Sequence, residues 1–258
     1  TSAKNFLSRN SHFCKSALSQ YTQQDFVALV QKHNIDFHEK KLGQLFCDNS
    51  SQQIIDMLIK ECSAAGVVIK TQTSITKIEF VEDRYIVETN QGLISTSSLV
   101  IATGGLSIPK IGATKFGYDI ARQFGLSVTE TRPGLVPLVF SDSMLERCKT
   151  LSGLSVDAKV SCGNASFSEG LLFTHRGLSG PSILQISSYW TEGNEIIVDL
   201  APETDVQFFL KEQRRLQPKQ EIHNTLSDIL PKRLAASISD DMNVAGRMGD
   251  MSDAVIKM

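Results

Sequence analysis

The sequence predicts an α/β unit over residues 1–133, a β-rich, barrel-like domain over residues 134–201 and a small helical domain over residues 202–258. Three observations predict this division. A short apolar run in the first part ends abruptly in small residues. The tripeptide Arg132-Pro-Gly134 interrupts both helical and strand patterns, and after Ala201-Pro-Glu203 the apolar residues recur at helical spacing. A chain of 258 residues is long enough to bury a substantial core.

The first part is expected to alternate helices and strands. Thr22 and Asp25 form a capping box, which predicts the second of two helices within residues 11–33. A further helix is expected from Ser50 or Ser51 to Gly66, and a last one over residues 118–124. Apolar and β-branched runs predict strands at residues 35–38, 44–47, 67–70, 75–80, 84–89 and 93–95. The last of these strands lead into a buried strand at residues 99–102.

The second and third parts differ in their apolar periodicity. Strands are expected at residues 135–140, 154–162, 165–167, 171–174 and 195–200. One helix over residues 181–189 interrupts them, and it begins with Pro181, whose missing N–H costs little in a first helical turn. From Glu203 onward the pattern is helical, with breaks at Pro218 and Pro231.

The run Leu99-Val-Ile-Ala-Thr-Gly-Gly105 is the strongest candidate for a binding segment. Its apolar half suits a buried strand, and Ala102 to Gly105 then remove side-chain bulk where that strand ends. In open α/β sheets nucleotide cofactors bind just beyond the carboxyl ends of strands. A tight turn at Gly104 and Gly105 explains the same residues. From these residues alone, cofactor contact and tight turn both stay open.

Charge and cysteine content exclude several classes of protein. Lys and Arg number 26 against 28 Asp and Glu, so no global positive field favours nucleic acid or an anionic membrane surface. No apolar run has the length of a membrane span. The five cysteines are widely spaced without a C-x-x-C pair, which indicates reduced thiols in a cytoplasmic protein and neither disulfides nor a metal site. No G-x-G-x-x-G or P-loop motif occurs.

Four strings in order resemble one family. They are Leu45-Phe-Cys47, Leu99 to Gly112, Phe116-Gly-Tyr118 and Leu172-Phe-Thr-His-Arg-Gly-Leu-Ser-Gly-Pro181. Together they resemble the YhiN/BaiN-type, or aminoacetone-oxidase-like, family of FAD-dependent flavoproteins, and the resemblance covers essentially the whole chain. It implies a partial FAD domain of the two-dinucleotide-binding type, followed by the β-rich and helical domains.

The resemblance also implies a function and cofactor contacts. It implies that the chain is the internal part of an FAD-dependent oxidoreductase with a small-molecule substrate, and that NAD(P) is a possible second cofactor. Ile75 would touch the adenine, and Ala102, Thr103, Gly104 and Gly105 would pass the ADP portion. The chain would start after the pyrophosphate-binding segment and end before a carboxy-terminal segment that returns to the flavin. On its own it is expected to be inactive and free of cofactor.

His175 and Arg176 form a second candidate site, on the substrate or flavin side. Arg offers a fixed donor fork, and His titrates near neutral pH. The alternative is a glycine-rich turn that packs one domain on another, with His175 hydrogen-bonded for structure, and the residues favour this alternative. No catalytic residue, metal ligand or oligomeric state can be assigned. The alternative to an enzyme is a non-catalytic binding or assembly domain on a flavoprotein-like scaffold.

Overall fold

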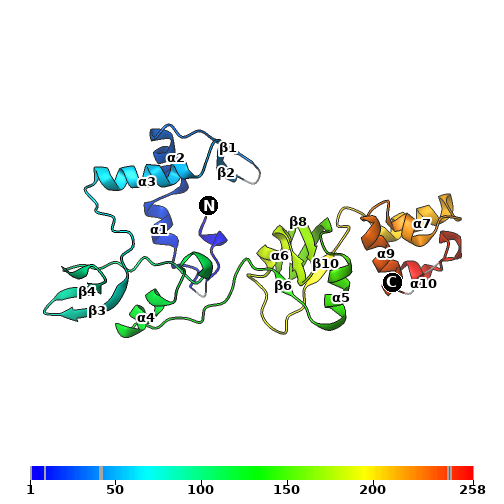
Figure 1. Cartoon of the computed structure of the whole chain (residues 1–258). Coiled ribbons are helices and arrows are strands. Elements are labelled where there is room, and N and C mark those ends of the chain that lie inside the picture. Colours follow the sequence, from blue (N-terminus) through cyan, green and yellow to red (C-terminus); the bar gives the residue numbers. More distant parts are fainter. Residues whose placement is uncertain (1, 9, 41–42, 243, 245, 258) are drawn as a thin grey trace. The chain divides into compact units, whose positions relative to one another are not determined.

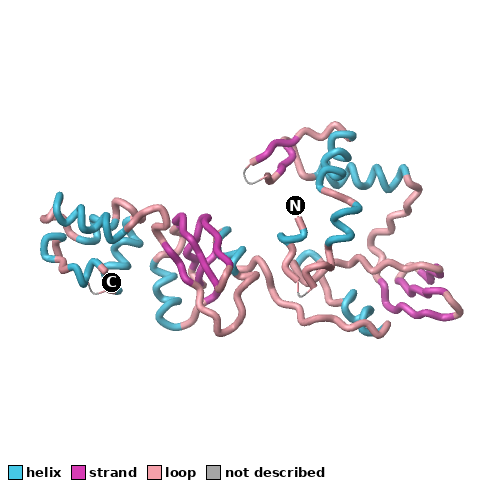
Figure 2. Tube along the Cα trace, turned by 180° about the vertical axis from the view of Figure 1, so that it is seen from behind, coloured by secondary structure: helices cyan, strands magenta, loops and turns pink. Residues whose placement is uncertain are grey.

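The structure is a computed structural model that describes residues 2–8, 10–40, 43–242, 244 and 246–257. The chain divides into two compact units, Thr1–Val128 and Thr129–Met258, which we call unit 1 and unit 2. Figure 1 labels their helices and strands, and Figure 2 separates helix, strand and loop by colour.

The first half of unit 1 is a small helical cluster with one hairpin. Its elements are η1 (Ala3–Asn5), α1 (Lys15–Gln20), α2 (Gln23–Lys32), β1 (Phe37–Glu39), β2 (Leu45–Cys47) and α3 (Gln52–Ala64). The predicted capping box is confirmed, because the Thr22 backbone N–H donates to Asp25 Oδ2 (2.7 Å) and Thr22 Oγ1 accepts from the Asp25 N–H. Val30, Ile35 and Met57 form the core of this part.

An ionic cluster joins the end of α2 to α3. Glu61 Oε1 lies 2.7 Å from His33 Nε2 and 3.0 Å from Lys32 Nζ. The hydrogen bond from His33, followed by the one from Lys32, holds the pKa of the Glu61 carboxyl below its ordinary value of 4.5. A carboxylate with a lowered folded pKa stabilises the fold above its unfolded pKa, and loses that contribution as the pH falls through the folded value.

We therefore expect Glu61→Gln to lower the urea midpoint of unfolding at pH 7. The difference in midpoint from the wild type should shrink below pH 4.5. There Glu61 is protonated first in the unfolded chain and, as the pH falls through the lowered folded pKa, also in the folded protein. Urea titrations from pH 7 to pH 3 measure this. Glu203→Gln is the control, because Glu203 is exposed and makes no ion pair among the described residues. A difference that stays constant over the whole pH range would contradict the prediction.

The second half of unit 1 is the predicted β meander with a covering helix. Strands β3 (Ile75–Val81), β4 (Arg84–Thr89) and β5 (Gly92–Thr96) pair antiparallel in that order. They are followed by η2 (Pro109–Ile111) and α4 (Phe116–Gln123). Ile78, Val87 and Ile120 form a shared core, and Gln123 Nε2 donates to the Ile78 carbonyl (2.6 Å). Helix α4 is therefore fixed on the meander.

Two predicted strands of unit 1 are wrong. Residues 67–70 and 99–102 are not strands, and Figure 2 shows both as loop. Val68 is 78% exposed and Val100 is 83% exposed. The physical reason is that a strand needs a neighbour to satisfy its N–H and C=O groups. No described strand pairs with either segment, so the buried strand expected at residues 99–102 does not form.

Unit 2 contains the β-rich part. Its strands are β6 (Leu138–Val139), β7 (Ser155–Cys162), β8 (Ala165–Thr174), β9 (Gly177–Ser179) and β10 (Ile197–Asp199), in the antiparallel order β10-β7-β8-β9-β6. The described residues show no pairing between β10 and β6, so this sheet is open rather than a closed barrel. Helices α5 (Asp142–Thr150) and α6 (Pro181–Ile186) flank it (Figure 1).

The sequence predicted most of this sheet but not all of it. The two short strands expected at residues 165–167 and 171–174 are one continuous strand, β8, because Gly170 continues the pairing with Asp157. The strand expected at residues 135–140 is only two residues long. Helix α5 and strand β9 were missed: α5 is short and mostly polar, and β9 has the composition of a turn.

The last part of unit 2 is helical, as the apolar spacing predicted. It contains α7 (Val206–Leu216), α8 (Ile222–Leu226), α9 (Lys232–Asp241), η3 (Met248–Asp250) and α10 (Asp253–Ile256). Pro218 and Pro231 lie between the helices, and Asp205 caps α7 by accepting from the Phe208 N–H (3.0 Å). Leu210 and Leu234 belong to the same core cluster as Val160 of the sheet. The separate helical domain stays a prediction.

Candidate functional site

The predicted cofactor segment lies against the start of helix α4. A Cβ atom added at Gly117 would collide with Thr103 Oγ1 and would lie 3.4 Å from Ile101 Cγ2. A Cβ atom added at Gly105 would lie 3.1 Å from the Tyr118 hydroxyl. The lack of side chains at Gly105 and Gly117 therefore allows helix and segment to approach closely. This contact fixes one side of the segment.

The other side of the segment is open at Gly104. Its φ is +69°, which is a turn conformation that favours glycine, and a Cβ atom there would meet nothing within 4 Å. Turn geometry and open space thus coexist, and both interpretations of Ala102 to Gly105 remain. Ile75, the first residue of β3, is 40% exposed, and no hydrogen bond among the described residues joins it to the segment. The cofactor contacts of Ile75, Ala102, Thr103, Gly104 and Gly105 stay predictions.

A substitution by asparagine separates the two interpretations, because asparagine tolerates positive φ. We expect Gly104→Asn in the full-length protein to weaken FAD binding at least about tenfold, which corresponds to about 1.4 kcal/mol, with little change in melting temperature. The reason is that its side chain would occupy the open side. Gly125→Asn is the matched control, since Gly125 has φ +78° and equally empty surroundings. Parallel losses of stability and FAD affinity in Gly104→Asn would favour the turn.

His175 and Arg176 lie at the exposed turn between β8 and β9. Thr174 Oγ1 accepts from the N–H groups of Arg176 (3.3 Å) and Gly177 (3.1 Å), and the Arg176 carbonyl accepts from the Phe140 N–H (3.1 Å). In the described part of the chain neither the His175 nor the Arg176 side chain makes a hydrogen bond or ion pair. The turn itself is thus well fixed, and a substrate or flavin role for the two side chains stays a prediction.

The glycines of this turn region serve packing. A Cβ atom at Gly177 would collide with the Leu138 carbonyl of β6, and one at Gly180 would lie 2.5 Å from the Gly170 carbonyl of β8. Ser182 Oγ adds a hydrogen bond of 3.1 Å to the same Gly170 carbonyl. The glycine-rich motif therefore brings β6, β8 and the start of α6 into close contact within unit 2, whereas the packing alternative expected contact between two domains.

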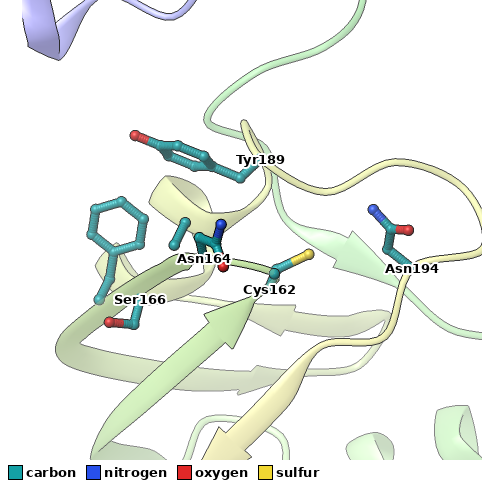
Figure 3. Close-up of a pocket in the computed structure, with 8 residues that line it drawn as sticks. Cys162, Asn164, Ser166, Tyr189 and Asn194 are labelled. Carbon is teal, nitrogen blue, oxygen red and sulfur yellow. The ribbon is translucent and has the colours of Figure 1, made fainter.

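An open pocket lies at the turn between β7 and β8, and its volume is about 610 Å³. Figure 3 shows that Cys162 Sγ points into the space between Tyr189 and Asn194. The side chains that line the pocket include Cys162, Asn164, Ser166, Phe167, Tyr189 and Asn194. The sequence gives no sign of this pocket, because its residues belong to two strands and to the turns between and after them, and no motif connects them.

A second, more apolar pocket of about 630 Å³ adjoins the sheet of unit 2. Its lining includes Phe140, Cys148, Phe173, Leu178 and Trp190. Burial raises the pKa of the Cys148 thiol. Arg147, which also lines the pocket, forms an ion pair with Asp241, so its charge is already compensated.

Several kinds of site are not observed in the described residues. There, no three His, Cys, Asp or Glu side chains gather closely enough to hold a metal ion. The cysteines Cys14, Cys47, Cys62, Cys148 and Cys162 are all free thiols. Within the same residues, no helix combines the length and apolar character needed to cross a bilayer.

A β meander that leads into a segment without side-chain bulk, followed by a helix packed on it, is what a nucleotide-cofactor domain of a flavoprotein would contribute. Comparison with protein families agrees. The HI0933-like protein Rossmann domain matches residues 1–174, and the HI0933-like protein barrel and H2TH domain matches residues 132–258. The chain belongs to the HI0933-like family, an FAD-binding flavoprotein family, which supports the resemblance found in the sequence.

Three proteins with named activities are similar to this chain in sequence. It is 46% identical over 253 residues to the ribosomal RNA dihydrouridine synthase of Escherichia coli (strain K12), covering 98% of this chain and 62% of that protein. It is 42% identical over 237 residues to the protein of the same name from Haemophilus influenzae, covering 89% and 58%. A 3-dehydro-bile acid delta(4,6)-reductase of Clostridium scindens is 21% identical over 206 residues, covering 75% and 49%. The chain thus spans about three fifths of the first two relatives.

Proposed function

We propose that the protein to which this chain belongs is an FAD-dependent reductase that converts a uridine of ribosomal RNA to dihydrouridine. The observation that carries the proposal is the 46% identity to the E. coli synthase, which extends over 98% of this chain. The H. influenzae relative, which has the same name, is 42% identical. Similarity over nearly the whole chain includes both units, so it concerns more than a shared cofactor fold.

The reaction reduces the C5=C6 bond of uracil by adding a hydride to one carbon and a proton to the other. When bound and reduced by NAD(P)H, FAD would supply the hydride, and the protein supplies binding and orientation. Thr103 to Gly105, fixed by α4 on one side and open at Gly104 on the other, fit a backbone that lies along the cofactor. The G-x-G-x-x-G motif that commonly holds a pyrophosphate is absent from these 258 residues.

This proposal differs from the sequence expectation of a small-molecule substrate and no nucleic acid. The exclusion of nucleic acid rested on the net charge of −2, which describes these 258 residues alone, and the small-molecule substrate was implied by the family resemblance. The bile acid reductase relative keeps a small-molecule substrate as the second candidate, at 21% identity. The names of both kinds of relative denote a reduction, so the reaction type is better supported than the substrate.

The test is an assay of the purified full-length protein with FAD, NADPH and ribosomal RNA transcribed without modifications. Nucleosides from the digested RNA are analysed by mass spectrometry for dihydrouridine, which carries two more hydrogen atoms than uridine. Dihydrouridine at a single position supports the proposal. Flavin absorbance with NADPH oxidation but no dihydrouridine would contradict the RNA substrate, and a colourless, inactive protein would favour the non-catalytic scaffold.

A further inference from the structure

We propose that the open pocket at the β7–β8 turn binds one nucleobase of single-stranded RNA. The proposal rests on the proposed function for the class of substrate, and on the pocket itself for the kind of contact. With about 610 Å³, the pocket is within the range of roughly 300–1,000 Å³ found for small-molecule sites. Nothing in the function proposed above assigns it a role.

The wall of the pocket carries an aromatic pair. The rings of Phe167 and Tyr189 lie 5.6 Å apart with an interplanar angle of 49°, and Tyr189 is 42% exposed. Tyr189 lies in the turn three residues after the end of α6, whose Ile183 and Ile186 are fully buried. The Tyr189 N–H donates to the Ile186 carbonyl (2.9 Å). An exposed ring on a rigid support is suited to stacking, which is how proteins hold the bases of single-stranded RNA.

Two amides provide hydrogen-bonding groups beside the rings. Gly163 has φ +55° and opens the two-residue turn between the paired residues Cys162 and Ala165, which presents Asn164 at the tip. Among the described residues the Asn164 side chain makes no hydrogen bond, so its donor and acceptor are both available. Asn194 Nδ2 donates to Thr191 Oγ1 (2.9 Å), which leaves the Asn194 side-chain oxygen as an acceptor. An amide can pair with the N–H and C=O groups on the edge of uracil.

The charge of the pocket favours an uncharged, planar ligand. Its lining residues carry no formal charge at neutral pH: they are Cys162, Gly163, Asn164, Ala165, Ser166, Phe167, Tyr189 and Asn194. Glu192, on the same loop as Asn194, is paired with Arg132 (2.9 Å), and Glu195 would oppose rather than attract a phosphate. The base, not the phosphate, is therefore the part of RNA that this pocket recognises, and its contribution should depend little on salt.

The experiment measures binding of a fluorescein-labelled eight-nucleotide oligouridylate to the 258-residue chain by fluorescence anisotropy. We expect Tyr189→Ala to weaken binding roughly 5- to 150-fold, the effect of losing one base stack. Tyr189→Phe should retain most of the affinity because it keeps the ring. The ratio of wild-type to Tyr189→Ala affinity should be the same at low and high salt. Tyr21→Ala is the matched control, since Tyr21 is 53% exposed in unit 1.

A 5-iodouracil version of the same oligonucleotide should crosslink to the peptide that contains Tyr189. Equal binding by the wild type and Tyr189→Ala, or a crosslink to another peptide, would overturn the proposal that this pocket binds a nucleobase. The proposed function would stay intact. Absence of any binding of the oligouridylate by the wild-type chain would also overturn the proposal of nucleobase binding. The proposed function fails separately, when the full-length protein forms no dihydrouridine.

Discussion

Replacing Gly177 with alanine is expected to destabilise unit 2 by at least about 3 kcal/mol. Gly177 has φ +149°, and a Cβ atom there would collide with the Leu138 carbonyl, which belongs to the strand paired with β9. The alanine can therefore be accommodated only if β6 and β9 separate, and this breaks the pairs of Leu138 with Leu178 and of Val139 with Gly177. Native domains are stable by only about 5–15 kcal/mol, so the loss would be a large share of the total.

Urea unfolding monitored by the fluorescence of Trp190 measures this loss. The chain has one tryptophan, and it lies in unit 2, so the signal reports on that unit. Gly163→Ala is the control: Gly163 also has positive φ (+55°), but a Cβ atom there would meet nothing within 4 Å. We expect a cost of about 1 kcal/mol for the control, from backbone conformation alone. Equal losses in the two variants would show that the contact with β6 is not the cause.

Titration of the 258-residue chain with FAD is expected to show binding no tighter than millimolar. In this class of fold the two cofactor phosphates are held mainly by N–H groups of a glycine-rich turn and helix N-terminus, and the chain contains no G-x-G-x-x-G motif. Loss of about three charge-assisted hydrogen bonds at roughly 1.5–3 kcal/mol each removes about 5 kcal/mol or more. At about 1.4 kcal/mol per factor of ten, affinity falls by more than about three orders of magnitude.

Calorimetry or flavin fluorescence measures the affinity, and the full-length protein in the same buffer is the positive control. A cooperative thermal transition of the chain shows that it is folded during the titration. Micromolar or tighter binding by the chain would mean that other residues hold the pyrophosphate. It would also contradict the expectation that these residues are an internal part of a larger cofactor site.

Local sequence signals predicted individual elements well. The capping box at Thr22 and Asp25 marks the start of α2 because both of its hydrogen bonds form within four residues. The proline breaks at Pro218 and Pro231 separate the helices of unit 2 for the same local reason. The strands of the meander were also predicted, since short turns place each strand beside its neighbour.

The candidate site depends on contacts that local sequence signals do not predict. The apolar run Leu99 to Ile101 and the small residues after it were visible in the sequence, and so was the choice between turn and cofactor contact. Whether the run becomes a strand depends on a partner strand, which no local pattern supplies, and Val100 is accordingly 83% exposed. The contact between Thr103 and Gly117 likewise depends on how α4 packs.

The sequence by itself determined the family, the order of most elements and the glycine-rich segments at Gly104 and Gly177. Only the tertiary structure decided what these segments touch: open space at Gly104, and the backbone of β6 at Gly177. It alone brought Asn164, Tyr189 and Asn194 to one pocket. The physical reason is that capping, turns and periodicity act between residues close in the chain, whereas pockets and close backbone contacts arise when distant segments pack to bury a common core.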